Sequence, residues 1–365
     1  MKSKFFVLLL VFGLLAFGVF GCGGEETAPV DEEAPGEDEE EVVETEGSYK
    51  LGLGVITSIG RSRDATDELT AQAQADVVMA AVLFDADGRV VSVTINNAQT
   101  RVPFDEDMQV AADLTVPGKT KVELGDDYGM IRVSEIGKEW YEQMEAFESW
   151  MIGQTVDEIK SLQVKVVDDA HQNVPDVPEL TSLVTITVED YIAAVEYAYN
   201  HSIDVENAVS AGLGTEISIA RSRGYDEAND IMPMAQIDNT MAAVAFDANG
   251  VVVGALIDNA QIRINFDEEG QVTSDRSVAP KTKVQLGDEY GMRRVSEIDK
   301  EWYEQIAALS EWMVGQTVDE ILSLQVKVVD DAHQNVPDVP ELTSSVTITV
   351  ESYLACVAEA YANAK

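Results

Sequence analysis

The stretch VVMAAVLFDADGRVVSVTI, residues 77–95, decides the fold. Two runs rich in β-branched residues flank Asp-Ala-Asp-Gly, a typical hairpin turn, and predict two antiparallel strands. The tetrapeptide also resembles the start of a calcium-binding loop. Asn96, however, stands at the twelfth position, where such a loop needs a bidentate glutamate, so we interpret it as a turn. The residues that follow, Asn-Asn-Ala-Gln at 96–99, are expected to break the second strand.

The region after this hairpin is expected to be helical. One apolar stripe at helical spacing predicts a helix that stops at Gly153, and it consists of Ile136, Trp140, Met144, Phe147 and Met151. TVDE at 155–158 and TVED at 187–190 are capping boxes that open two further helices. LQVKVV, residues 162–167, predicts a strand between them. The expected class is α+β, with an antiparallel sheet covered by helices.

The same plan occurs twice. MAAVLFDADG begins at Met79 and MAAVAFDANG at Met241. We predict two tandem domains, residues 49–203 and 204–365, each long enough to bury its own core. The stretch SLQVKVVDDAHQNVPDVPELTS is identical at 161–182 and 323–344. It is either a working site or the least-diverged part of a recent duplication.

The first residues are expected to lie outside the fold. Lys2 and Lys4 precede an apolar run, which predicts a signal peptide over residues 1–21. The run ends in VFGC, which resembles the bacterial lipobox and implies a lipid on the thiol of Cys22; the alternative is an ordinary signal peptide with a chance cysteine. Residues 22–48 are acidic and predict a disordered tether. We expect an exported protein, held by its lipid on the extracytoplasmic face of the cell membrane.

The charge of the chain limits its partners. With 67 acidic and 24 basic residues the formal net charge is -43, which excludes nucleic acid as a partner by electrostatic repulsion. A salt-adapted proteome would also explain this acidity. With Cys22 acylated, Cys356 has no partner for a disulfide, and we expect it to be a small buried residue.

No pattern in the sequence predicts a catalyst. No nucleophile elbow is present. His171 and His333 each follow Asp-Asp-Ala and could ligate a metal, but they fall in a proline-rich stretch that predicts a solvated loop. We expect a binding or electron-transfer protein, with no metal site.

The scarce basic residues recur in clusters. In a polyanion such clusters can hold a phosphate or carboxylate group; the alternative is ion pairing with the surplus acid. They are Arg61 with Arg63, Arg221 with Arg223, Lys119 with Lys121, and Lys281 with Lys283. Aromatic residues that could stack on a flat ligand are Tyr128, Trp140 and Tyr141, with Tyr290, Trp302 and Tyr303 in the second copy. Trp140 and Trp302 lie on the helix stripe and are expected in the core.

The end of each repeat resembles a known family. WMVGQTVDEILSLQVKV, residues 312–328, followed by ELTSSVTITVESYLACVAEAYANA, is similar to the C-terminal part of the bacterial FMN-binding domain of exported electron-transfer lipoproteins. The hairpin FDANGVVVGALI, which begins at Phe246, resembles that family's strand pair. A signature close to Asp-x-x-Ser-Gly-Ala-Thr-Ser/Thr carries FMN on its threonine there. The resemblance implies Thr347 and Thr185 as flavin-bearing positions, with Ser344 and Ser182 beside them, and we expect Arg61, Arg63, Arg221 and Arg223 to meet the phosphate.

Both segments depart from that signature. Glu replaces Asp, Val replaces Ala, and Ser345 or Leu183 replaces Gly. Covalent attachment is therefore expected to be lost, at least in the first repeat. The fold would then hold non-covalent FMN, another flat ligand, or none. The sequence leaves two main functions open, extracytoplasmic electron transfer through FMN and a non-redox binding or interaction role, with a purely structural surface protein as a third.

Overall fold

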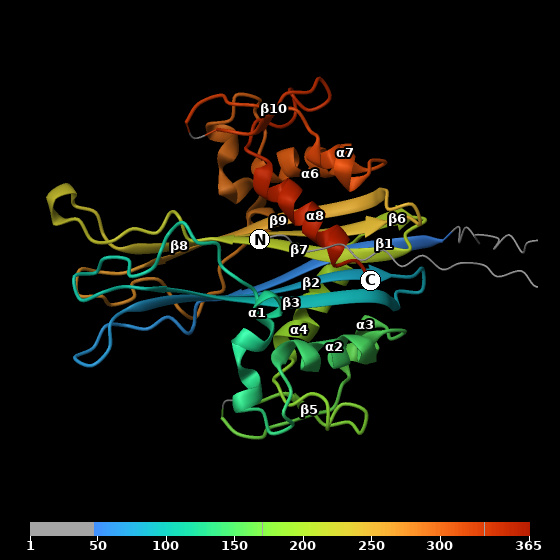
Figure 1. Ribbon diagram of the computed structural model, residues 1–365, viewed down its shortest axis with the longest axis horizontal. Helices are drawn as coiled ribbons and strands as arrows, with labels where there is room; N and C mark the ends of the chain where they lie inside the picture. Colours follow the sequence, from blue (N-terminus) through green and yellow to red (C-terminus); the bar gives the residue numbers. More distant parts are fainter. Residues whose placement is uncertain (1–46, 170, 332) are drawn as a thin grey trace, which may run out of the picture. The chain divides into compact units, whose positions relative to one another are not determined.

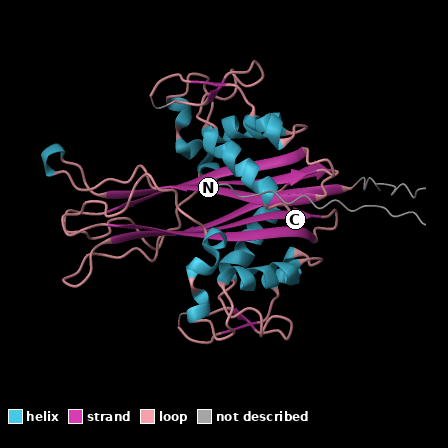
Figure 2. Cartoon of the chain, viewed as in Figure 1, coloured by secondary structure: helices cyan, strands magenta, loops and turns pink. Residues whose placement is uncertain are grey.

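A computed structural model describes residues 47–169, 171–331 and 333–365, which belong to one compact unit. The predicted signal peptide, Cys22 and the tether up to residue 46 lie outside the described residues. Within those ranges, no helix is long and apolar enough to span a bilayer. The expected α+β class, with helices on antiparallel sheets, is confirmed (Figure 2).

The hairpin at 77–95 forms as predicted. Strand β2 (Gln72–Phe84) pairs antiparallel with β3 (Val90–Pro103), and β1 (Ser48–Ser58) pairs with the other edge of β2. The expected break at 96–99 is wrong, because β3 runs through it. The buried amide of Asn96 donates to Thr120 Oγ1 at 3.0 Å and accepts from the backbone N–H of Asn97 at 2.8 Å. Its polar groups are satisfied inside the fold and require no turn.

The second repeat builds a similar sheet from β7 (Ser210–Ser218), β8 (Met234–Phe246) and β9 (Val252–Asn265). The connecting segment forms β6 (Ile203–Glu206), which pairs with β1 in the first sheet, in the order β3-β2-β1-β6. The predicted domain boundary at 203/204 thus falls inside a strand of that sheet. At the equivalent place in the second repeat, Lys365 exchanges backbone hydrogen bonds of 3.1 and 3.3 Å with Ala211.

Short helices follow each hairpin in the same order. In the first repeat these elements are α1 (Lys121–Leu124), η1 (Gly125–Tyr128), η2 (Met130–Arg132), α2 (Trp140–Met151), α3 (Val156–Lys160), β4 (Val164–Lys165), β5 (Val174–Pro175) and α4 (Glu189–Asn200). In the second they are α5 (Lys283–Leu286), η4 (Gly287–Tyr290), η5 (Met292–Arg294), α6 (Trp302–Met313), α7 (Val318–Leu322), β10 (Val326–Lys327), β11 (Val336–Pro337) and α8 (Glu351–Ala362). The second repeat also has η3 (Glu227–Asn229), which lies before its hairpin, between β7 and β8.

Two of the predicted local signals differ from the structure. The capping box at Thr155 forms as predicted, with reciprocal bonds to Glu158. The box predicted at Thr187 is wrong, because α4 begins at Glu189 with Val188 as its N-cap and no side-chain cap. The strand predicted over 162–167 is shorter in the structure, where it comprises only the two residues of β4. Among the described residues, β4 pairs with the two residues of β5, and this partner is too short to support a longer strand.

The described residues are arranged in four layers, helices–sheet–sheet–helices (Figure 1). The inner faces of the two sheets form a common core, with the rings of Phe104 and Phe266 4.9 Å apart. Each outer face carries its own helices, with Trp140 in one core and Trp302 in the other. The sequence analysis expected one core for each repeat and did not anticipate the shared one.

Glycines let the long helices lie directly on the sheets. A Cβ built on Gly54 of β1 would stand 1.8 Å from the carbonyl oxygen of Ala194 in α4. Gly214 of β7 meets Cys356 O in α8 at the same distance. No side chain fits at either crossing, because the backbone of the helix occupies its space. Cys356 is fully buried, as predicted.

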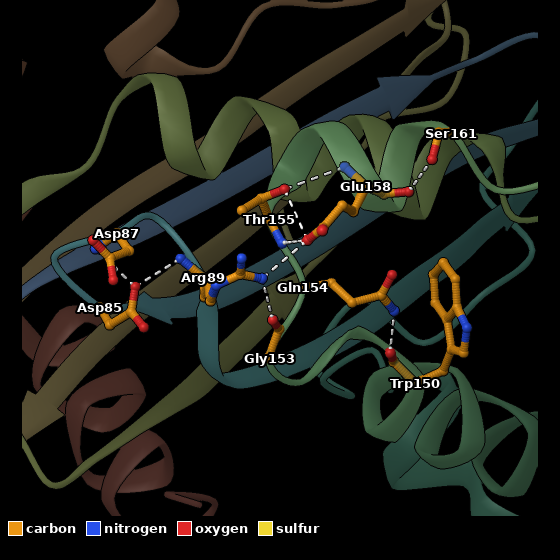
Figure 3. A network of polar contacts seen from close by, with 9 residues as sticks. All are labelled: Asp85, Asp87, Arg89, Trp150, Gly153, Gln154, Thr155, Glu158 and Ser161. Carbon is orange, nitrogen blue, oxygen red and sulfur yellow. Dashed lines mark hydrogen bonds and ion pairs between the residues drawn. The ribbon is translucent and has the colours of Figure 1, made fainter.

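A polar network ties the hairpin turn of the first repeat to the start of α3 (Figure 3). Arg89 Nη1 donates to the carbonyl of Gly153 at 2.8 Å and to Glu158 Oε2 at 3.1 Å, while the Arg89 N–H donates to Asp85 Oδ1. Val251 takes the place of Arg89 in the second repeat. This ion pair therefore belongs to one repeat and is not needed to form the fold.

Candidate functional site

Each repeat contains a cavity among its helices and the loops that join them. The cavity of the first repeat has a volume of about 400 Å³ and that of the second about 450 Å³. The walls come from the segment around η2, from α2 and from the loop that leads to α4, with their counterparts in the second repeat. Every residue that lines one cavity is matched by the same residue type at the equivalent position of the other. The two cavities are therefore chemically the same.

The stretch that is identical in both repeats forms one wall of this cavity. In the first repeat it supplies Lys165, Val167, Asp168, His171, Val174, Pro175 and Thr181. Identity also extends to lining residues outside the stretch, such as Met130 and Gln143. Core-facing positions on α2 are less uniform: Phe147 is replaced by Leu309, although Trp140 and Met151 are kept as Trp302 and Met313. The residue types that line the cavity are thus the same in both repeats, both inside and outside the identical stretch.

Thr185 and Thr347 both lie on the cavity wall. The Oε1 atom of the fully buried Gln143 accepts from the Thr185 N–H at 2.9 Å and from its hydroxyl at 3.2 Å. Gln305 holds Thr347 at the same two distances. A buried amide on α2 or α6 therefore fixes each threonine hydroxyl at the edge of the cavity.

The neighbouring signature positions lie differently. Ser182 and Ser344 are exposed on the preceding helical turn, and among the described residues they do not line the cavities. Leu183 and Ser345, which stand where the resembled family has glycine, have no positive φ. The backbone here does not require glycine, so a larger residue is accommodated without strain.

His171 lies in an exposed loop, as predicted, and also contributes to the cavity wall. Its Nδ1 atom lies 2.8 Å from Asp168 Oδ1, and His333 pairs with Asp330 at 2.9 Å. Across the described ranges, no group of three or more His, Cys, Asp or Glu residues is arranged to hold a metal ion. The loop therefore supplies hydrogen-bonding groups to the cavity.

A second pocket adjoins the first cavity and shares Met130 and Val133 with it. It has a volume of about 420 Å³ and contains the basic cluster 119–121. The two lysines of the cluster differ in exposure: Lys119 is exposed, whereas Lys121 is buried, with 8% of its surface exposed. The ammonium of Lys121 lies 5.0 Å from the ring centre of Tyr128 and 5.2 Å from that of Trp140.

The charge state of Lys121 reflects this burial. Loss of water, helped by the charges of Arg61 and Arg101 and opposed by that of Asp76, lowers the pKa of Lys121 to about 8. Burial likewise lowers the pKa of Lys283 to about 8. No atom of the described residues accepts a hydrogen bond from either ammonium. Within that part of the chain, the contacts of the Lys121 and Lys283 ammonium groups are therefore to aromatic rings rather than to a carboxylate or carbonyl oxygen.

A network of side chains on β2 and β3 forms the floor beside Lys121. Asp76 accepts from Gln74 Nε2 at 3.0 Å and from Gln99 Nε2 at 3.0 Å, and Arg101 Nε donates to Gln74 Oε1 at 3.0 Å. The second repeat reproduces it with Gln236, Asp238, Gln261 and Arg263. This network was not predicted from the sequence. The pattern that indicates it is polar residues at every second position of otherwise buried strands.

The four arginines predicted to meet a phosphate lie in different surroundings. Arg61 is exposed near Lys121, whereas Arg63 turns away and donates to the carbonyl of Thr70 at 3.2 Å. Arg223 likewise donates to Met232 O at 3.4 Å, and Arg221 acts on Lys283. We call the cavity that contains Thr185 or Thr347 the threonine cavity of its repeat. Within the described part of the chain, none of these four arginines lines a threonine cavity.

The aromatic residues are mostly structural. Trp140 and Trp302 are each 1% exposed, and each donates its indole N–H to a core tyrosine at 3.1 Å. The hydroxyls of Tyr141 and Tyr303 donate to Asp126 and Asp288 at 3.1 and 3.3 Å. Of the aromatic residues predicted to stack on a ligand, Tyr128 lines the basic pocket.

Comparisons with known proteins give one partial match. No family model matches the chain, and no solved structure gives a significant match. A stretch of 128 aligned residues, 32% of this chain, is 30% identical to a Desulfitobacterium hafniense protein named chlorophenol reductase. The match covers 38% of that protein, well under two thirds of its length. The chain is thus similar to one part of that protein.

Proposed function

We propose that each repeat binds one flat ligand of the flavin type in its threonine cavity, with FMN as the first candidate, and that the chain carries electrons outside the cytoplasm. One observation carries the proposal: the threonine that the family resemblance marks lies, in both repeats, on the wall of a cavity with an identical lining.

The cavities are suited to such a ligand in size and chemistry. Volumes of about 400 and 450 Å³ fall in the range of small-molecule sites. Apolar side chains such as Val174 and Ile186 would contact a ring system, while Lys165 and the fixed hydroxyl of Thr185 would contact its polar edge or tail. Bound FMN would supply the redox chemistry, and the protein would hold and orient it.

The alternative is a non-redox ligand-binding or interaction lipoprotein that has lost flavin. The departures from the signature favour it, since Leu183 and Ser345 replace the glycine. The partial relative is named a reductase, which agrees with a redox role but does not separate the two functions. In both cases we propose export and membrane anchoring through a lipid on Cys22, which lies outside the described residues.

The test is a visible absorption spectrum of the mature protein made in a host that supplies a flavin transferase, before and after acid precipitation. Flavin that stays with the precipitate is covalently attached; Thr347→Ala should abolish it if the second repeat alone carries it, and halve it if both repeats do. Flavin released into the supernatant is bound non-covalently. Thr273→Ala is the control, because Thr273 is exposed and outside the cavity, and it should leave the spectrum unchanged. A protein that stays colourless after incubation with FMN would exclude the redox proposal.

A further inference from the structure

We propose that Lys121 and Lys283 each form the centre of a binding site for an oxyanion, a phosphate or carboxylate group. These sites are distinct from the threonine cavities and do not depend on flavin. The first argument is the state of the lysine itself. Lys121 is 8% exposed and Lys283 9% exposed, and across the described residues neither ammonium has a hydrogen-bond acceptor or an ion-pair partner. The Lys121 side chain nevertheless lines an open pocket.

Such a lysine is unfavourable as a purely structural residue. A buried ammonium without an acceptor loses its hydration and gains no hydrogen bond in return. The rings of Tyr128 and Trp140, at 5.0 and 5.2 Å, recover part of that loss through cation–π attraction. Yet both repeats retain lysine at a position where methionine would fill the same space. An anion in the pocket would provide the missing acceptor.

The surroundings of Lys121 favour a negative ligand. Arg101 and Lys119 line the same pocket, and Arg61 is close enough to lower the pKa of Lys121. The nearby carboxylate of Asp76 is already engaged, because it accepts hydrogen bonds from Gln74 and Gln99. Asp127 also lines the pocket, so its three cationic residues outnumber its one carboxylate although the chain as a whole has a net charge of -43.

The geometry of Arg101 suits an oxyanion. Gln74 accepts from its Nε at 3.0 Å and Gln99 from its Nη2 at 3.4 Å, which fixes the guanidinium on the sheet. Its Nη1 has no acceptor among the described residues. A fixed guanidinium beside an ammonium matches two oxygens of a phosphate or carboxylate through charge-assisted hydrogen bonds.

The second repeat repeats this arrangement with one difference. Lys283 lies 5.2 and 5.1 Å from the rings of Tyr290 and Trp302, and Arg263 is fixed by Gln236 at 3.0 Å. Lys281, the counterpart of Lys119, forms an ion pair of 2.8 Å with Glu289, however. Lys119 has no such pair among the described residues. We therefore expect the second site to bind the same anion more weakly.

The experiment titrates the full mature chain with inorganic phosphate by calorimetry at low ionic strength, with chloride as the blank. The wild type should bind two phosphates per chain, Lys121→Met one, and the variant carrying both Lys121→Met and Lys283→Met none, with a loss of affinity of about tenfold or more at each altered site. Acetate that competes for both sites would extend them to carboxylates, and acetate that does not would identify phosphate sites.

Two controls keep the result interpretable. Lys160→Met removes an exposed cation outside the pocket and should still leave two phosphates bound. In the wild type labelled with ¹³C-lysine, phosphate should shift the Cε resonances of Lys121 and Lys283, whatever the folding of the variants. Unshifted resonances, or undiminished binding by the folded double variant, would overturn the proposal. No flavin is added, so failure of the flavin proposal does not affect this test.

Discussion

At the scale of single residues, one difference between the repeats has a measurable energetic effect. Asp258 on β9 is the counterpart of Asn96 on β3, and both are buried. The Oδ1 atom of Asp258 accepts from the N–H groups of Asn259 at 2.7 Å and Val284 at 3.1 Å. Burial still dominates and raises the pKa of Asp258 to about 6. The second repeat therefore contains a buried carboxylate where the first has a neutral amide.

Asp258→Asn should stabilise the protein at neutral pH. A carboxyl whose folded pKa is raised contributes stability below its unfolded pKa near 4 and loses that contribution as the pH rises through about 6. Relative to the variant, the wild type should therefore lose on the order of 2 kcal/mol between pH 4 and pH 7. The measurement is urea unfolding at both pH values.

The reverse exchange at the equivalent position is the matched control. Asn96→Asp should destabilise the protein at pH 7 and less so at pH 4, because it introduces the same buried carboxyl in the first repeat. A pH-independent difference between the wild type and Asp258→Asn would show that Asp258 titrates normally in the folded state.

At the scale of elements, the crossing of helix and strand imposes the strictest steric requirement. Gly54→Ala would place a methyl group 1.8 Å from Ala194 O, which forces α4 away from β1. We expect a loss of about 2–3 kcal/mol in the free energy of unfolding. Thermal and urea unfolding would measure it.

Gly60→Ala is the comparison for this change. The nearest atom to a Cβ there lies 3.4 Å away, in the exposed turn after β1, so the stability should stay within about 0.5 kcal/mol of the wild type. Equal stability of the two variants would contradict the close packing of α4 on β1.

Sequence periodicity predicted the elements whose cause is local. The hairpin at 77–95 and helix α2 formed because alternating and helical apolar spacing determine which face is buried. Asn96 was misjudged because its partner, Thr120, lies far along the chain. The sequence also could not predict that the two members of each basic cluster, Arg61 and Arg63 or Lys119 and Lys121, lie in different environments. The direction of each side chain depends on packing. The polar floor around Asp76 needs β2 and β3 in register, which a single strand does not show.

At the scale of the whole molecule, the core between the sheets joins the two repeats. Side chains such as Met79 and Leu83 of one sheet pack with Met241 and Ile262 of the other. A single repeat would expose this entire apolar sheet face to water, at a cost proportional to its area.

An isolated first repeat, residues 47–206, should therefore form a dimer through that face. Light scattering coupled to size exclusion should give twice the mass of the fragment at micromolar concentration. Met79→Glu, which places a charge on the inner face, should abolish the dimer. A folded, stable monomer of the unaltered fragment would show that the shared core is dispensable.

The shared core also bears on how the two halves can change. In a dimer of identical chains, every substitution appears in both subunits at once, so a site cannot be altered without its twin. Here the pairing surface is sealed between two halves of one polypeptide, and the two outer helical layers lie on opposite sides of it (Figure 1). Each half can therefore acquire its own substitutions. Unlike the subunits of a dimer, the two halves do not dissociate at low protein concentration, because one polypeptide joins them. Asp258, the ion pair of Lys281 and the contrast of Leu183 with Ser345 are differences between the halves of the kind that this arrangement allows.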